Sequence, residues 1–206
     1  MLNQVQHDKS RKIREICVLF ENMRKLKITE LNRISIEEFK ETEKIPLIVV
    51  LDNVRSQHNI GSFFRTCDAF LVESVYLCGI TSVPPNAEIH KTALGAEFSV
   101  DWKYFAETTD AVSQLKQAGY TVFAIEQVDN SIMLPDLQLD KTKKYAVVLG
   151  NEVKGVQQEA VNLCDGSIEI PQFGTKHSLN VSITGGIVIW EFFQKVMQLS
   201  NKKITE

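Results

Sequence analysis

Apolar residues follow two different patterns from about residue 44 onward. In the first, short runs with hardly a polar interruption end at a Gly, Asp, Glu or Pro. Such runs are typical of strands that are buried on both faces of a sheet. We therefore predict strands over residues 46–52, 74–79, 121–126, 145–150 and 167–171.

The second pattern is the helical spacing of apolar residues between these strands. It predicts helices over residues 60–70, 108–118, 156–163 and 179–199. Residues 79–88, which contain Pro84 and Pro85, predict a loop, and residues 129–144 predict a polar connection. Strands that alternate with helices indicate an α/β fold with a mainly parallel sheet and helices on both faces.

Length and composition limit the class of protein. The chain has 206 residues and a formal net charge of −3, which fits one globular domain, or one domain with a small appendage. It lacks an apolar run of the roughly 18 residues that a membrane helix needs. The polar N-terminus does not resemble a signal peptide, so we expect a cytoplasmic protein.

The cysteines indicate neither a zinc site nor a redox dithiol, because no C-x-x-C pair is present. Cys67 and Cys78 stand in apolar surroundings and are expected in the core, whereas Cys17 and Cys164 carry no such signal. A chain of this size in the cytoplasm does not need a disulfide framework.

The N-terminal part differs in charge from the rest. Residues 1–33 hold eight basic and four acidic residues, a balance of +4, so residues 34–206 carry −7. We expect residues 1–45 to form a basic helical extension and residues 46–206 the main domain. Two interpretations stay open, a basic and partly amphipathic helical arm and a solvated helix packed on the body. The helical spacing on which both rest is that of Ile13, Ile16, Cys17 and Phe20.

Three polar loops follow three of the predicted strands. They read NVRSQHNIGSFFR after residue 52, GNEVKGV after residue 149 and QFGTKHSLN after residue 171. In parallel sheets, ligands bind beyond the carboxyl ends of the strands. We therefore expect these loops to form one site on one rim of the sheet.

The first loop has the pattern N-x-G-x-x-x-R, with Asn59, Gly61 and Arg65. Asn59 is suited to be a helix N-cap, and Gly61 would allow close approach of another backbone or of a ligand. A helix start with an Arg suits a phosphate or carboxylate. The alternative is a capped helix with a surface Arg.

The second loop contains Gly150, Glu152 and Gly155, but the chain has neither a P-loop nor G-x-G-x-x-G. Glycines in a strand-to-helix turn expose backbone groups that suit a flat polar ligand such as adenine. Glu152 is either an anion at a helix start or a site residue.

The third loop ends in Ser178, Leu179 and Asn180. Ser178 is a candidate N-cap of the last helix, which would leave Asn180 one step inside the helix, where Asn is unfavourable. The neighbouring His177 suggests a hydrolytic Ser–His pair, but no G-x-S-x-G elbow supports it.

Together the three loops resemble the motifs of the SpoU-type, or TrmH-like, RNA ribose 2′-O-methyltransferases of the SPOUT class. The matching strings are DNVRSQHNIGSFFRTCDAF, VVLGNEVKGV and IEIPQFGTKHSLNVSITGG, in the family's order and spacing over roughly residues 46–198. Two positions depart from the family's pattern. Leu71 stands where Gly is usual and Cys67 where Ala is common, and both are core-side changes that leave the polar residues intact.

The resemblance implies a fold with a C-terminal trefoil knot, which sequence patterns alone would not suggest. It also implies that the second and third loops bind S-adenosylmethionine in a bent shape and that no metal is needed. The cofactor-binding residues carried over are Glu126, Leu149, Gly150, Glu152, Gly155, Ile170, Pro171, Ser178 and Leu179.

The catalytic set implied by the resemblance is Asn59, Arg65, Glu152, Ser178 and Asn180. Arg65 would reach the site from a partner subunit. In the family this Arg is often proposed to activate the hydroxyl, but a guanidinium has a pKa above about 12 and hardly deprotonates. The alternative is that Arg65 binds the neighbouring phosphate and stabilises the developing alkoxide, and both roles stay open.

The family is dimeric, and the last helix has apolar groups on more than one face, which fits a dimer or burial against its own sheet. The implied activity is methylation of a ribose 2′-hydroxyl in structured RNA, with tRNA slightly favoured over rRNA. The alternative is a catalytically silent RNA-binding or assembly protein on the same fold. The apolar residues of that helix are Ile183, Ile187, Val188, Trp190, Phe192, Phe193, Val196 and Met197.

Overall fold

The computed structural model describes residues 24–200. The chain divides into two compact units, Met1–Ser35 and Ile36–Glu206. In the described part of the first unit, Arg24 forms an ion pair of 2.7 Å with Glu30, the last residue of the short 3-10 helix η1 (Ile28–Glu30). The helix predicted from the spacing of residues 13–20 lies outside the described residues.

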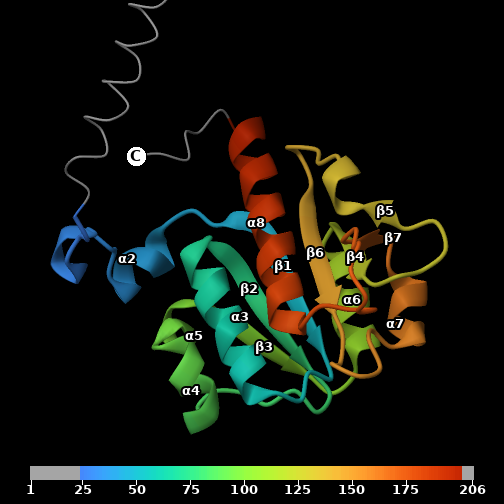
Figure 1. The fold of residues 1–206 in the computed structure, drawn as a ribbon, viewed down its shortest axis with the longest axis horizontal. Helices are drawn as coiled ribbons and strands as arrows, with labels where there is room; N and C mark the ends of the chain where they lie inside the picture. The colour runs from blue at the N-terminus through green and yellow to red at the C-terminus, as the bar shows by residue number, and fades with distance from the viewer. Residues whose placement is uncertain (1–23, 201–206) are drawn as a thin grey trace, which may run out of the picture. The chain divides into compact units, whose positions relative to one another are not determined.

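The second unit is built on a parallel sheet of seven strands, which confirms the predicted α/β fold with a mainly parallel sheet, although only five of the strands were predicted (Figure 1). The strand order is β3-β2-β1-β6-β4-β7-β5, and every neighbouring pair is parallel. The strands are β1 (Ile45–Asp52), β2 (Val72–Cys78), β3 (Trp102–Phe105), β4 (Tyr120–Ile125), β5 (Ile132–Met133), β6 (Lys144–Leu149) and β7 (Gly166–Glu169).

Helices cover both faces of the sheet, and this prediction is also confirmed. Figure 1 shows α3 and α8 side by side on one face, and these two helices pack against each other. The opposite face packs against α6 and α7. The helices are α2 (Ile36–Glu41), α3 (Gln57–Ala69), α4 (Ala87–Ala93), α5 (Ala96–Ser99), α6 (Thr108–Gln117), α7 (Gln158–Leu163) and α8 (Val181–Leu199).

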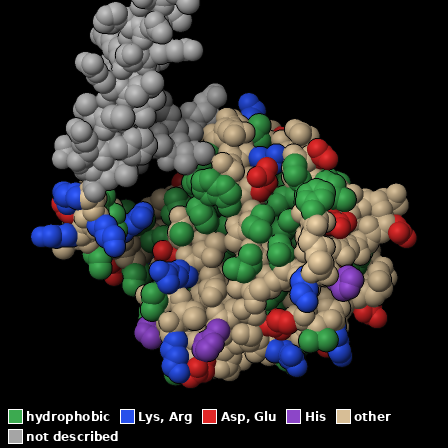
Figure 2. Space-filling view, viewed as in Figure 1, with side chains coloured by type: hydrophobic (Ala, Val, Ile, Leu, Met, Phe, Trp, Pro, Cys, Tyr) green, Lys and Arg blue, Asp and Glu red, His purple; other side chains and the backbone are tan. Residues whose placement is uncertain are grey.

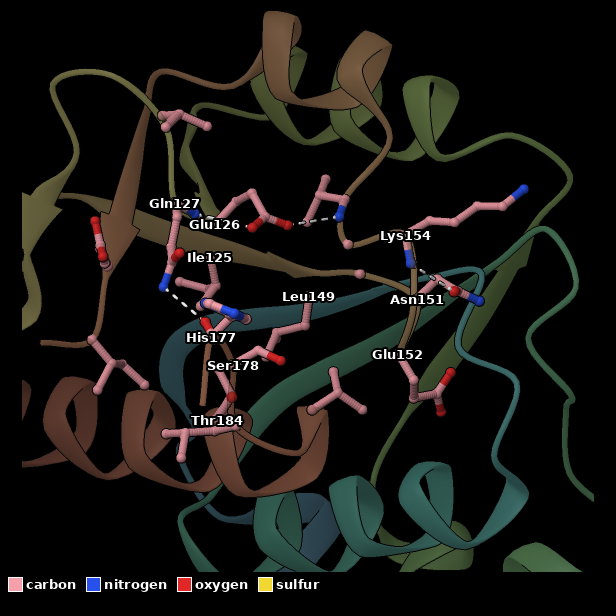
Figure 3. A pocket seen from close by; sticks show the side chains of 18 of the residues that line it. Ile125, Glu126, Gln127, Leu149, Asn151, Glu152, Lys154, His177, Ser178 and Thr184 are labelled. Carbon is pink, nitrogen blue, oxygen red and sulfur yellow. Dashed lines mark hydrogen bonds between the residues drawn. The ribbon is translucent and has the colours of Figure 1, made fainter. Parts of the chain in front are cut away.

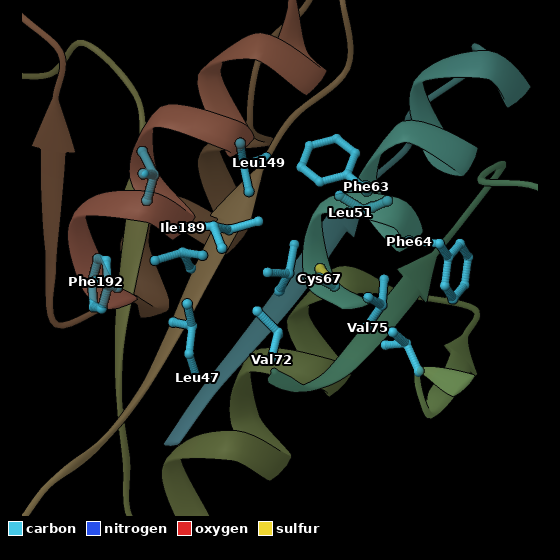
Figure 4. Packing of buried hydrophobic residues seen from close by; sticks show 14 of the residues in the cluster. Leu47, Leu51, Phe63, Phe64, Cys67, Val72, Val75, Leu149, Ile189 and Phe192 are labelled. Carbon is cyan, nitrogen blue, oxygen red and sulfur yellow. The ribbon is translucent and has the colours of Figure 1, made fainter. Parts of the chain in front are cut away.

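The sequence of strand β1 is apolar at nearly every position because both faces of the strand are buried. Side chains of a strand point alternately to its two faces. Leu47, Val49 and Leu51 lie in the core under α3 and α8, whereas Ile48 and Val50 lie in the core under α6. Figure 4 shows the first core, where Phe63 and Phe64 of α3 and Ile189 and Phe192 of α8 meet the sheet.

Four elements were not predicted from the sequence, namely α2, α4, α5 and β3. All four are short. Strand β3 lies at an edge of the sheet, where its side chains are half-buried or exposed, so its sequence shows only a weak alternation of apolar and polar residues. The connection 129–144 also holds β5 and the 3-10 helix η2 (Leu134–Asp136). None of the helices in the described part of the chain is long and apolar enough to cross a membrane.

Core positions that the sequence singled out are buried as expected. Cys67 and Cys78 are fully buried, and burial raises the pKa of the Cys78 thiol to about 12. Leu71, which stands where the family usually has Gly, has φ +53°, the left-handed region that glycine adopts most easily. Its side chain packs against the core beside α8, and that contact offsets the backbone cost.

Candidate functional site

A cavity of about 670 Å³ opens beyond the carboxyl ends of β4, β6 and β7 (Figure 3). Its lining residues come from segments 125–128, 149–161 and 168–184. The second and third polar loops therefore meet at one rim of the sheet. A volume between about 300 and 1,000 Å³ is typical of a small-molecule site.

The second loop is a tight turn whose backbone forms part of the cavity wall. The N–H groups of Asn151 and Gly155 each donate to the carbonyl of the other, at 3.0 and 2.9 Å. Gly155 has φ +68°, and a Cβ on Gly150 would lie 2.0 Å from the carbonyl carbon of Gly155. Side chains are thus excluded at both positions, and a ligand meets bare backbone there.

Glu126 holds this turn from the neighbouring strand. Its Oε2 accepts a 3.0 Å hydrogen bond from the N–H of Val156, and its Oε1 accepts one of 3.0 Å from the N–H of Gln127. The side chain of Gln127 in turn donates to the carbonyl of His177, at 3.2 Å. Figure 3 shows this chain of contacts along one wall of the cavity.

Glu152 connects the second loop to the first. Its carboxylate accepts hydrogen bonds from the N–H of Arg55 at 3.1 Å, the N–H of Ser56 at 3.0 Å and the Asn59 amide at 2.9 Å. Partial burial alone would raise the pKa of Glu152, but these hydrogen bonds outweigh it and hold the pKa below its ordinary value. Glu152 is therefore an ionised anion at the start of α3, and it also lines the cavity.

Asn59 and Asn180 are linked directly. Asn180 Nδ2 donates to Asn59 Oδ1 at 3.3 Å, and Ser182 Oγ donates to the same oxygen at 3.3 Å. Asn59, Glu152 and Asn180, which come from three different loops, thus form one hydrogen-bonded group. Ser182 was missed by the sequence analysis because nothing but its position two residues after Asn180 distinguishes it.

Two expected helix caps were wrong. The N-cap of α3 is Ser56, whose hydroxyl accepts from the N–H of Asn59 at 3.3 Å. Asn59 is the third residue of that helix, so its side chain is free to reach Glu152. The N-cap of α8 is Asn180, whose Oδ1 accepts from the N–H groups of Ser182 and Ile183, and not Ser178. Asn180 therefore stands at the N-cap, where Asn is favourable, and not one step inside the helix as the sequence predicted.

Gly61 allows close approach of a backbone and not of a ligand. A Cβ there would lie 2.3 Å from the carbonyl oxygen of Ile89 in α4, and Gly61 does not line the cavity. Arg65 is exposed on α3, does not line the cavity either, and takes part in none of the hydrogen bonds and ion pairs among residues 24–200.

Most of the cofactor-binding residues expected from the sequence lie at the cavity, and Pro171 is the exception. The residues that line it are Glu126, Leu149, Gly150, Glu152, Gly155, Ile170, Ser178 and Leu179. Within the described part of the chain, no group of three or more His, Cys, Asp or Glu side chains could hold a metal ion.

Known proteins confirm the resemblance on which these expectations rest. Residues 46–190 match the family model of the SpoU rRNA methylases. The chain belongs to this family. A tRNA (guanosine(18)-2′-O)-methyltransferase of Thermus thermophilus is 34% identical over 163 residues, which cover 79% of this chain and 82% of that protein.

Solved structures of the family share the fold. The TrmH/SpoU tRNA modifying enzyme of Aquifex aeolicus has a TM-score of 0.70 at 27% identity, covering 80% of this chain and 84% of that one. An AdoMet-bound rRNA methyltransferase of Sinorhizobium meliloti has a TM-score of 0.67 at 29% identity. The similarity covers 79% of this chain and 61% of the Sinorhizobium chain.

Proposed function

We propose that this protein transfers the methyl group of S-adenosylmethionine to a ribose 2′-hydroxyl of RNA. The observation that carries the proposal is the group formed by Asn59, Glu152 and Asn180, in which the first motif bonds to residues of the second and third motifs that line the cavity. A silent RNA-binding protein on the same fold would have no need of this arrangement. Arg65 and Gly150, whose loss would favour that alternative, are both present.

The cavity fits the cofactor in size and in chemistry. Leu149, Ile170 and Leu179 supply apolar surface for a flat ring, and the turn around Gly150 supplies bare backbone. We expect the adenine to lie among Gly150, Ile170 and Leu179. Glu126 lies on the same wall, near the expected position of the cofactor.

When bound, S-adenosylmethionine supplies an electrophilic methyl group on a sulfonium. The protein's part is to align the ribose oxygen with that methyl and to stabilise the charge that develops on the oxygen. Asn180 Nδ2 carries two hydrogens. One is donated to Asn59, so the other can donate a hydrogen bond to the ribose. Ser178 also lines the cavity, and its hydroxyl has no partner among the described residues.

Glu152 acts in this proposal as a positioning residue rather than as the base. Three donors already bind its carboxylate, and its lowered pKa makes it a weak proton acceptor. Arg65 would bind the phosphate beside the target ribose and stabilise the alkoxide. Because Arg65 does not line the cavity of its own chain, we propose that a second copy supplies it.

A homodimer is supported by an apolar stripe on the outside of α8. Ile183, Ile187 and Trp190 are exposed there at helical spacing. Trp190 stacks on Phe193 at 5.9 Å and contacts Phe70, the C-cap residue of α3, at 5.3 Å, measured between ring centroids. Figure 2 shows hydrophobic side chains gathered over α8. An exposed patch of this kind is typical of an interface, and α3, which carries Arg65, lies beside it.

The strand order supports the trefoil knot that the family implies. The consecutive strands β4 and β5 do not pair with each other, because β7 lies between them. The chain after β6 returns to the sheet between these two strands as β7. In a trefoil knot, the C-terminal segment would be threaded through the connection between β4 and β5 at this place. Tracing the backbone of a crystal structure tests this part of the proposal.

The class of RNA and the role of residues 1–45 remain predictions. The family relatives above act on tRNA or on rRNA by their names, and we keep tRNA as slightly favoured for this chain. We keep residues 1–45 as a basic extension that contacts the RNA and 46–206 as the methyltransferase domain. Location in the cytoplasm likewise stays a prediction.

The test of the proposed function uses the full chain. Calorimetry should show binding of S-adenosylmethionine, and labelled methyl groups should enter unmodified tRNA or rRNA transcripts. Alkaline hydrolysis should then spare the bond beside the modified nucleotide, because 2′-O-methylation removes the attacking hydroxyl. Cofactor binding without transfer to either class of RNA would favour the silent alternative.

A further inference from the structure

The third loop exposes an aromatic side chain beside the mouth of the cavity. Phe173 is 97% exposed, the largest value among the exposed large hydrophobic residues of the described chain. Its neighbour Gln172 lines the cavity, and so does His177 at the other end of the loop. Exposure of this ring to water at the entrance of a site is unfavourable. We therefore expect the ring to contact a ligand that is not part of this chain.

The backbone around Phe173 is held loosely. Among the described residues, no backbone-to-backbone hydrogen bond involves residues 171–179. The Gln127 amide restrains one end of the loop by donating a hydrogen bond to the carbonyl of His177. The ring can therefore adjust its position to a ligand without breaking other structure.

Two cations belong to the loops that form the cavity. Lys154 lines the cavity from the second loop, and Lys176 stands three residues after Phe173. Neither lysine takes part in an ion pair among residues 24–200. The nearby carboxylates of Glu126 and Glu152 already accept hydrogen bonds from backbone N–H groups. The rim thus presents one free ring and two unpaired positive charges.

We propose that Phe173 stacks on a nucleobase next to the nucleotide being methylated, with Lys154 and Lys176 contacting the flanking phosphates. The inference rests on the proposed function and names the substrate contact of that site. Aromatic side chains beside cations are the usual means of holding an unpaired strand, because every base has a face on which a ring can stack. A protein partner would require more apolar surface than one ring between Gln172 and Gly174.

The test compares four forms of the full-length protein: the wild type, Phe173→Ala, Phe173→Leu and Phe173→Trp. The probe is a short single-stranded RNA with 2-aminopurine as the reporting base, titrated in the presence of S-adenosylhomocysteine. Removal of a base stack costs about 1–3 kcal/mol, so Phe173→Ala should weaken RNA binding by about 5- to 150-fold. Phe173→Trp should bind as the wild type does, and Phe173→Leu should resemble Phe173→Ala.

Two further readouts separate stacking from other roles of the ring. The affinity for S-adenosylmethionine and the sedimentation of the protein should be the same in all four forms. The proposal is overturned if Leu restores RNA binding as well as Trp does, if the cofactor affinity falls in parallel, or if the oligomeric state changes. Unchanged RNA binding in Phe173→Ala also overturns it.

Failure of this inference differs from failure of the proposed function. A wild type that binds RNA through Phe173 but transfers no methyl group would refute the activity and keep the stacking contact. A Phe173→Ala variant that binds and methylates RNA as well as the wild type would do the reverse. Replacement of both Lys154 and Lys176 by Gln should lower the salt dependence of RNA binding by about 1.4 to 1.8 in slope.

Discussion

The Asn59 amide donates a 2.9 Å hydrogen bond to Glu152 Oε1 and so joins two loops that are 93 residues apart in the sequence. The same Asn59 accepts from Asn180 through its other amide atom. Asn59 therefore connects the loop that follows β6 with the loop that leads into α8. A change at any of the three residues is expected to move the other two.

Replacement of Glu152 by Gln tests this arrangement. The Gln amide group would face N–H donors in place of a carboxylate oxygen, so the alignment of the loops should be lost. We expect kcat to fall by about 10- to 100-fold, the range that misplacement of reacting groups produces. Single-turnover methyl transfer measures the effect. Glu159→Gln, at an exposed position on α7, is the control and should leave the rate unchanged.

The lowered pKa of Glu152 predicts how stability depends on pH. A carboxyl group whose folded pKa lies below its unfolded value, about 4.3 for Glu, stabilises the protein fully above that unfolded value. The contribution disappears as the pH falls through the folded pKa. The difference in Tm between the wild type and Glu152→Gln should therefore be constant above about pH 5 and shrink in more acidic solution. A difference that grows with acidity would contradict the assignment.

Asn180 has two roles that substitution can separate. Asn180→Ala removes the N-cap of α8 and should destabilise the protein by about 1 kcal/mol, in addition to lowering activity. Asn180→Ser keeps a capping oxygen but loses the amide that donates to Asn59, so stability should be retained while methyl transfer falls. Denaturant unfolding and initial rates measure the two effects. Ser178→Ala, which removes no cap, should change stability by less than about 0.5 kcal/mol.

Arg65 tests whether the active site is shared between subunits. Arg65→Ala should remove most methyl transfer and leave the affinity for S-adenosylmethionine nearly unchanged, because Arg65 lies away from the cavity of its own chain. In a composite site, mixing Arg65→Ala with Asn180→Ala subunits creates heterodimers with one intact site. Random exchange should restore about one quarter of the wild-type rate. If each inactive variant stays inactive after exchange, the site is contained within one subunit.

Asp52 predicts a cost in stability. It is fully buried at the end of β1, where it accepts hydrogen bonds from Thr108 Oγ at 2.6 Å and from the backbone and side chain of Gln157, both at 2.7 Å. Asp52→Asn would turn an amide group toward one of these donors and should destabilise the fold by about 1–3 kcal/mol. Urea unfolding measures this. Asp129→Asn, at an exposed loop position, should be neutral within about 0.5 kcal/mol.

The central strands could be predicted because their burial requires a continuous run of apolar residues, which is easily recognised in the sequence. Both faces of β1 and β6 are buried, so nearly every residue in them is apolar. The edge strand β3 is half exposed, and α5 has only four residues, so neither gave a periodic signal. Folding of such short elements depends on contacts such as Ser99 to Asp68, which are distant in the sequence.

The sequence predicted which residues form the site better than it predicted how these residues contact one another. The sequence identifies Asn59, Glu152 and Asn180 as site residues. It does not indicate that Glu152 accepts hydrogen bonds from the backbone at the start of α3. The caps were misplaced because Ser56 and Asn59 are both good capping residues, and only the backbone decides between them. Ser182 and Phe173 show a further limit, since hydrogen bonding and exposure of single side chains leave no trace in spacing.

The last prediction concerns the basic N-terminal residues. Residues 1–33 carry +4 and the remainder −7, so attraction of RNA should be concentrated in the first part and at Arg65. Each phosphate contact releases counterions and adds about 0.7 to 0.9 to the slope of affinity against salt. Replacement of five cations in this part by Gln should weaken RNA binding and flatten that slope, with cofactor affinity and the dimer intact. The five are Arg11, Lys12, Arg14, Arg24 and Lys25.

One of these five should matter less than the others. Arg24 already forms an ion pair with Glu30, so Arg24→Gln alone should change the slope less than Lys25→Gln. An unchanged affinity and slope in the fivefold variant would show that the basic segment does not hold RNA. The RNA would then be held by the dimer cleft alone through Lys91, Lys154 and Lys176, and replacement of these three lysines by Gln should remove most of the salt dependence. Filter binding of tRNA transcripts over a range of salt concentrations decides between the two.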